Sequence, residues 1–140
     1  MTKDVLVDVS GLQLEVNSEE PIQLMTTGSY YMKNGKHYVL YDELTDDAQT
    51  VKNVLKITEK KVELTKKGDG SSYMLFEAGK ENLSYYDTPF GSLLLGVTTS
   101  KIQVDHEEDL MKLHIDYGLS INSDHVSDCV IDVSVRSKVQ

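Results

Sequence analysis

One segment decides the fold of this chain: Leu24-Met-Thr-Thr-Gly-Ser-Tyr-Tyr-Met-Lys-Asn34-Gly35-Lys-His-Tyr-Val-Leu-Tyr41-Asp-Glu43. Two runs with β character flank an Asn-Gly pair. Asn and Gly tolerate the positive φ angles that a two-residue type I′ turn requires, so this dipeptide is a strong signal for a β-hairpin. The segment therefore predicts two antiparallel strands, and the turn also fixes which residues lie opposite each other.

The predicted register separates the two faces of this hairpin. Counting outward from the turn places Lys33 opposite Lys36, and two lysines that face each other belong in water. The opposite face is predicted to point to the interior, and it carries Tyr30, Val39, Tyr41 and Glu43. Gly28 lies opposite Tyr41, where bare backbone leaves room for a ring and for a sharp bend. Tyr31 and Tyr38 are predicted to face solvent.

The rest of the chain repeats the β signal. Residues 111–121 alternate apolar and polar side chains, which places six apolar side chains, Tyr117 among them, on one face. A one-residue slip of the apolar pattern at Gly11 predicts a β-bulge in the first strand. Turn signals divide the chain into ten predicted strands: 5–16, 22–33, 36–43, 50–58, 61–66, 71–77, 81–88, 92–104, 111–121 and 126–136.

The short connections between these strands predict consecutive hairpins. So many strands in one twisted sheet tend to curl and close, because closure removes the exposed edges. We therefore predict an all-β fold, a single antiparallel up-and-down closed β-barrel of about ten strands, as one domain over residues 1–140. A two-sheet sandwich is the second choice.

Composition limits the partners and the location that we expect. The formal net charge of −9 at pH 7 repels phosphate backbones, which argues against nucleic acid. No apolar stretch reaches the roughly 20 residues that span a bilayer, and no secretion signal opens the sequence, so we expect no membrane association and a cytoplasmic location. The lysines concentrate in one region and are predicted to point outward from a hairpin: Lys52, Lys56, Lys60, Lys61, Lys66 and Lys67.

Candidate chemistry is sparse. Residues 106–109 read as a solvated turn rather than a metal site, because they lack the ligand spacing of zinc or calcium sites. His114 and Asp116 project to the same polar face and are interpreted as solvent-exposed. Cys129 belongs to the apolar row of the last strand, as a small core residue does. We therefore predict no catalytic residue, no metal and no cofactor.

Three segments carry a resemblance to a known family: residues 26–43, residues 86–93 and residues 113–119, the second with the motif Thr88-Pro89-Phe90-Gly91. Together they resemble the YwiB-like family of bacterial domain-of-unknown-function proteins. The resemblance implies a calycin-type β-barrel, related in architecture to lipocalins and fatty-acid-binding proteins. It implies no established activity, so no catalytic residue is carried over from it.

Two functions follow as expectations. The first is the binding of a small, partly apolar molecule inside the barrel, because buried tyrosine hydroxyls need hydrogen-bond partners that a ligand can supply. Phe90, at the tip of a rigid turn, is predicted to plug or gate one end. The predicted ligand-binding residues are Tyr30, Val39, Tyr41, Glu43, Phe90 and Tyr117.

The alternative is a non-enzymatic interaction or structural module whose barrel is filled by its own side chains. In that case the outer face, with Tyr31 and Tyr38, docks a protein partner or a second copy of the chain as a homodimer. An enzyme ranks third among the expectations.

Overall fold

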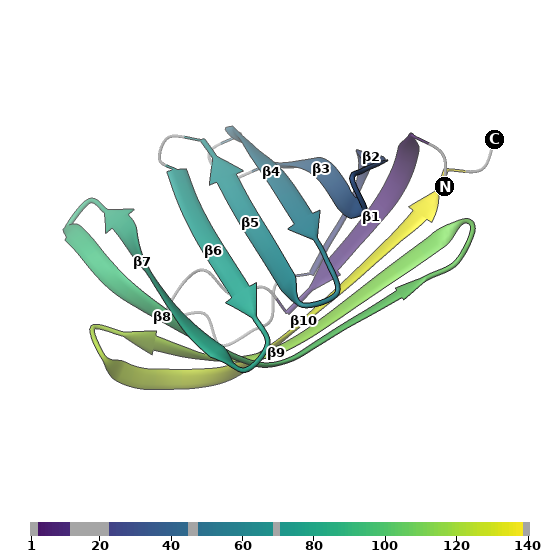
Figure 1. Cartoon of the computed structure of the whole chain (residues 1–140). Coiled ribbons are helices and arrows are strands. Elements are labelled where there is room, and N and C mark those ends of the chain that lie inside the picture. The colour runs from purple at the N-terminus through teal and green to yellow at the C-terminus, as the bar shows by residue number, and fades with distance from the viewer. Residues whose placement is uncertain (1–2, 12–22, 45–47, 69–70, 139–140) are drawn as a thin grey trace.

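The computed structural model describes residues 3–11, 23–44, 48–68 and 71–138, which form ten β-strands (Figure 1). The strands are β1 (Asp4–Ser10), β2 (Gln23–Lys33), β3 (Lys36–Leu44), β4 (Thr50–Ile57), β5 (Lys61–Lys67), β6 (Ser71–Glu77), β7 (Lys80–Thr88), β8 (Gly91–His106), β9 (Leu110–Ile121) and β10 (Asp124–Ser137). The described residues contain no helix long and apolar enough to cross a membrane.

All ten strands belong to one sheet in the order β6-β5-β4-β3-β2-β1-β10-β9-β8-β7. Every described pairing is antiparallel, and β1 pairs with β10, which joins the first strand to the last. The predicted all-β barrel is therefore confirmed, with one seam: β6 and β7 are not hydrogen-bonded neighbours.

The seam lies at the turn Ala78-Gly79, from which β6 and β7 separate in Figure 1. The Ala78 N–H donates to the Lys60 carbonyl at 3.3 Å, and the Gly79 N–H donates to the Thr99 carbonyl at 2.8 Å. The turn is thus bonded to both walls of the barrel, and the two strands that it joins do not continue as a hairpin.

The hairpin β2–β3 has the predicted register. Asn34 and Gly35 have φ angles of 54° and 75°, as a type I′ turn requires. Tyr30 pairs with Val39, and Gly28 pairs with Tyr41. A Cβ on Gly28 would lie 2.4 Å from the Leu40 carbonyl oxygen, so the backbone of β3 approaches this glycine too closely for any other residue.

Buried side chains of the described residues pack together in the barrel interior. Val7, Val39 and Val135 are fully buried, as is the larger Phe76 with 1% of its surface exposed. The described residues leave a cavity of about 10 Å³ at the centre of the barrel. It is lined by Tyr41 and by apolar side chains of β1, β4–β6, β9 and β10. Such a volume holds about one water molecule.

Two expectations are wrong, and a third can be compared with the structure only in part. Lys66 was expected to point outward but is buried, because period two places it on the face of Val62 and Leu64. Phe90 is fully exposed and therefore does not plug an end of the barrel. At Gly11, β1 has already ended and φ is 85°; the rest of the predicted first strand lies outside the described residues.

Candidate functional site

The predicted interior residues lie in three separate surroundings. Tyr30 stands at one mouth of the barrel, where its hydroxyl is 2.6 Å from His37 Nδ1. The His37 ring contacts the His106 ring edge to face, with centroids 4.9 Å apart. Burial lowers the pKa of His37, and the neighbouring His106 lowers it further. Tyr30 therefore already has a polar partner within the chain.

Tyr41 and Glu43 belong to a second group. Tyr41 lies opposite Asn53, which in turn lies opposite Lys66. The Lys66 Nζ is 2.9 Å from Glu43 Oε1, and the Asn53 amide donates to the same oxygen at 3.4 Å. Burial raises the pKa of Tyr41, and Glu43 adds to the effect. The predicted Glu43 is thus engaged in an ion pair.

Tyr117 forms the third group, in the other wall. Its ring packs edge to face on Phe76, with centroids 5.0 Å apart. Neither its hydroxyl nor the hydroxyl of the adjacent Thr99 has a hydrogen-bond partner among the described residues. Burial raises the pKa of Tyr117, and the Cys129 thiol nearby raises it further. Val39 is buried in the core, and Phe90 is exposed, so the six predicted residues do not form one site.

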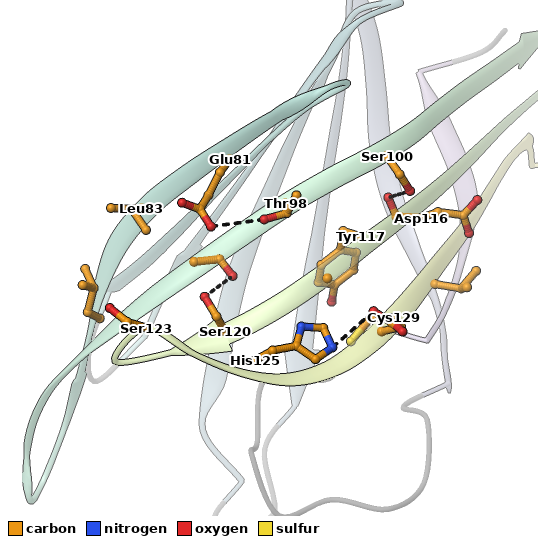
Figure 2. Close-up of a pocket in the computed structure, with 15 residues that line it drawn as sticks. Glu81, Leu83, Thr98, Ser100, Asp116, Tyr117, Ser120, Ser123, His125 and Cys129 are labelled. Carbon is orange, nitrogen blue, oxygen red and sulfur yellow. Dashed lines mark hydrogen bonds and ion pairs between the residues drawn. The ribbon is translucent and has the colours of Figure 1, made fainter.

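A large hollow formed by the described residues lies outside the barrel, on the outer face of β7–β10 (Figure 2). We call this depression of about 730 Å³ the outer groove. Four residues in register across the strands define it: Glu81 on β7, Thr98 on β8, Gly118 on β9 and Asp128 on β10. The small residues of the two central strands form the floor.

The next row in register has the same design. Leu83 on β7 lies opposite Gly96, Gly96 opposite Ser120, and Ser120 opposite His125. A Cβ placed on Gly118 would lie 3.4 Å from His125 Cε1 and 3.7 Å from Asp128 Oδ1, so both β10 side chains lean over the floor. Large side chains on the outer strands thus wall a floor of small ones.

Polar groups in the groove bond to each other. Thr98 donates its hydroxyl hydrogen to Glu81 Oε2 at 3.2 Å, and His125 Nε2 lies 3.3 Å from Asp128 Oδ1. Ser120 donates to the Gly96 carbonyl at 3.5 Å. These contacts, dashed in Figure 2, orient both walls and the floor.

A second depression of about 540 Å³ continues along the outer face towards β1. His114 stands between the two hollows, with Nδ1 2.6 Å from Asp132 Oδ1 and Nε2 3.0 Å from Asp116 Oδ1. The hydrogen bond to Asp132 and the charge of both carboxylates raise the pKa of His114 against partial burial. His114 and Asp116 lie on one polar face as predicted, but both are half-buried and paired rather than simply exposed to solvent, and the second carboxylate, Asp132, was not foreseen.

No group of three or more His, Cys, Asp or Glu side chains within the described ranges is arranged to hold a metal ion. The outer groove was not predicted from the sequence. The alternation of residues 111–121 does place Gly118 and Ser120 on the outward face, but a groove also needs matching small residues on β8 and large ones on β7 and β10.

Comparisons with known proteins give a consistent result. The chain matches the family of domains of unknown function DUF1934 over residues 7–133. It is 31% identical over 107 residues to an uncharacterised β-barrel protein, YwiB of Bacillus subtilis (strain 168), covering 76% of this chain and 75% of that protein. The crystal structure of the Bacillus subtilis ywiB protein superimposes with a TM-score of 0.75 at 26% identity, covering 97% of this chain and 91% of the other.

Proposed function

The chain belongs to the DUF1934 family of domains of unknown function, and from that premise we propose that it is a non-enzymatic binding module with a side-chain-filled barrel and an external ligand site in the outer groove. One comparison of volumes carries the proposal: about 730 Å³ in the outer groove against about 10 Å³ at the barrel centre. Small-molecule pockets generally have about 300–1,000 Å³.

The chemistry of the groove supports binding rather than catalysis. His125 is paired with Asp128, and the Ser120 hydroxyl is directed to a backbone carbonyl. Nucleophilic catalysis instead needs a base hydrogen-bonded to the attacking group. The groove offers carboxylates, hydroxyls and apolar surface from Leu83 and Val130, which are groups that orient a ligand.

Binding inside a calycin-like barrel is a second candidate, favoured by the unpartnered Tyr117 and Thr99 hydroxyls. A small molecule there would have to part β6 and β7, which lack a shared hydrogen-bond ladder. Docking through the outer tyrosines is less supported, because Tyr31 and Tyr38 stack on each other with ring centroids 5.0 Å apart. A homodimer through this pair stays a prediction.

Backbone amide NMR with a small-molecule extract of the host separates the outer site from the inner one. We expect saturable shifts at Thr98, Gly118 and Ser120, and loss of these shifts in Gly118→Leu, which fills the groove floor. Thr65→Leu, an outward position on β5, is the matched control and should respond as the unmodified protein does. Shifts centred on Val39 and Tyr41 instead would favour the interior site, and the absence of extract-induced shifts would contradict both.

A further inference from the structure

Strand β7 is an edge of the sheet. Within the part of the chain that the structure describes, it pairs with β8 on one side and with no strand on the other. Figure 1 shows β6 and β7 diverging from the turn that joins them. An edge strand presents unpaired backbone N–H and C=O groups, which makes it a template for a further strand. The free side of β7 is therefore a candidate interaction surface.

The hydrogen bonds of Leu94 on β8 show which backbone groups of β7 face this free side. The Leu94 N–H donates to Asn122 Oδ1 at 3.1 Å, and the Leu94 carbonyl accepts from the Asn122 N–H at 2.8 Å. Leu94 thus directs its backbone groups away from β7, so its pairing with Tyr85 is the kind without ladder hydrogen bonds. The backbone groups of Tyr85, and by alternation those of Leu83 and Glu81, point to the free side.

The side chains along this edge are open to a partner. Leu83 and Tyr85 have 62% and 71% of their surface exposed. Residues 80–88 contain no proline and the β7–β8 pairing has no register shift, so two common devices that block strand addition are absent from β7. On the inner face, Asn82 Nδ2 is buried and has no hydrogen-bond partner among the described residues. The edge thus combines exposed apolar surface with an unused donor.

We propose that β7 pairs antiparallel with β7 of a second copy of the chain, around a twofold axis at Leu83. In this register Leu83 lies opposite the partner's Leu83, and Glu81 lies opposite the partner's Tyr85. The backbone groups of these residues point to the free side, so both pairs form ladder hydrogen bonds. The Glu81 carboxylate also has lone pairs to accept the hydroxyl hydrogen of the partner's Tyr85.

The inner face fits a second copy in the same register. Asn82 lies opposite the partner's Ser84, in a pair without ladder hydrogen bonds, where side chains stand closest. The hydroxyl of the partner's Ser84 is an acceptor for the unused Asn82 amide. An axis at Ser84 would instead place Glu81 opposite the partner's Asp87, and like charges directly opposite each other are unfavourable. The charge pattern of β7 is therefore complementary to itself when the axis lies at Leu83.

The test is sedimentation velocity of the full chain over a range of concentrations. We expect a monomer–dimer equilibrium that salt shifts towards the dimer, because each copy carries a net charge of −9. Leu83→Lys places two like charges opposite each other and should weaken the dimer about tenfold or more, as should Leu83→Glu. A mixture of these two variants should form a heterodimer, because Leu83 lies opposite itself in the proposed register.

Val130→Lys is the matched control, since it changes an exposed apolar side chain on β10, away from the edge, and should leave the dimer unchanged. Circular dichroism checks that each variant is folded. A chain that stays monomeric at high concentration and high salt would overturn the proposal. A dimer that Leu83→Lys leaves intact would place the contact on another face, such as that of Tyr31 and Tyr38, and would also overturn it. Failure of the mixed variants to associate would contradict the register.

Discussion

Apolar side chains pack together inside the barrel, whereas small residues lie on the outer face of β8–β9. Inside, Tyr30 and Tyr41 lie among large apolar residues, and the space between the walls shrinks to about 10 Å³. Outside, Gly96 and Gly118 leave a hollow of about 730 Å³. Polar residues inside a barrel therefore do not by themselves indicate a binding site, whereas small residues aligned on an outer face can create one.

The difference follows from where partners are available. His37 satisfies Tyr30 from the adjacent strand, and Lys66 satisfies Glu43 from two strands away, so these interior polar groups need no ligand. In the outer groove the carboxylates of Glu81 and Asp128 have local partners but remain open to solvent on one side. Three substitutions and one pH titration test this contrast between the filled interior and the open outer face.

The largest effect is expected from Phe76→Ala in the filled interior. The substitution removes a buried ring that packs on Tyr117, and it should destabilise the fold by about 3–5 kcal/mol through lost burial and the cavity left behind. Urea unfolding followed by circular dichroism measures this loss. A loss below about 1 kcal/mol would mean that the side chains around Phe76 are not tightly packed.

Lys66→Ala is expected to have the next largest effect. It leaves the half-buried Glu43 carboxylate without its cation, which should lower the free energy of unfolding by about 1–3 kcal/mol. Lys67→Ala is the control, since the neighbouring Lys67 side chain is exposed and should change stability by no more than about 0.5 kcal/mol. Equal effects of the two substitutions would contradict the assignment of Lys66 to the interior.

Gly118→Leu should change stability little, within about 1 kcal/mol in either direction. The glycine does not have a positive φ, and an added Cβ would make only van der Waals contact with His125 and Asp128. Thermal unfolding of this variant beside Phe76→Ala would show the contrast between a filled and a hollow region. A loss as large as that of Phe76→Ala would show that the groove floor is structural rather than open.

The smallest expected effect is a difference in pKa between two histidines. His37, at the mouth of the barrel, should titrate below the ordinary value of about 6.5, and His114, on the outer face, should titrate above it. Protonation below about pH 6.5 therefore costs stability at His37. The His114 pair stabilises the fold below its unfolded pKa, and this contribution is lost as pH rises through the folded pKa. NMR titration of the ring protons, with His37→Gln and His114→Gln for assignment, checks both directions, and identical midpoints would contradict the inside–outside distinction.

Much of the fold could be predicted because its signals are local. The Asn34-Gly35 turn set the β2–β3 register, and alternation predicted that Val39, Tyr41 and Tyr117 are buried. Lys66 was predicted wrongly because it was grouped with neighbouring lysines by composition, although its position relative to Leu64 places it inside. The seam beside Gly79 could not be predicted, because a short turn between two strands favours a hairpin and only the strand order shows that β6 and β7 are not paired.

The candidate site shows the same limit. The tyrosines predicted to converge on a ligand lie in separate surroundings, because their packing partners come from both walls of the barrel. The groove needs Glu81, Gly118 and Asp128 in one row, and that row depends on pairing across four strands.

Local sequence patterns specify the strands, their faces and the register of one hairpin, because turn geometry and period-two alternation act over a few residues. Long-range packing sets which two strands, β6 and β7, are not hydrogen-bonded to each other, how completely the interior is filled and which outward side chains line up. These properties depend on contacts between residues far apart in the chain, and no local pattern records them.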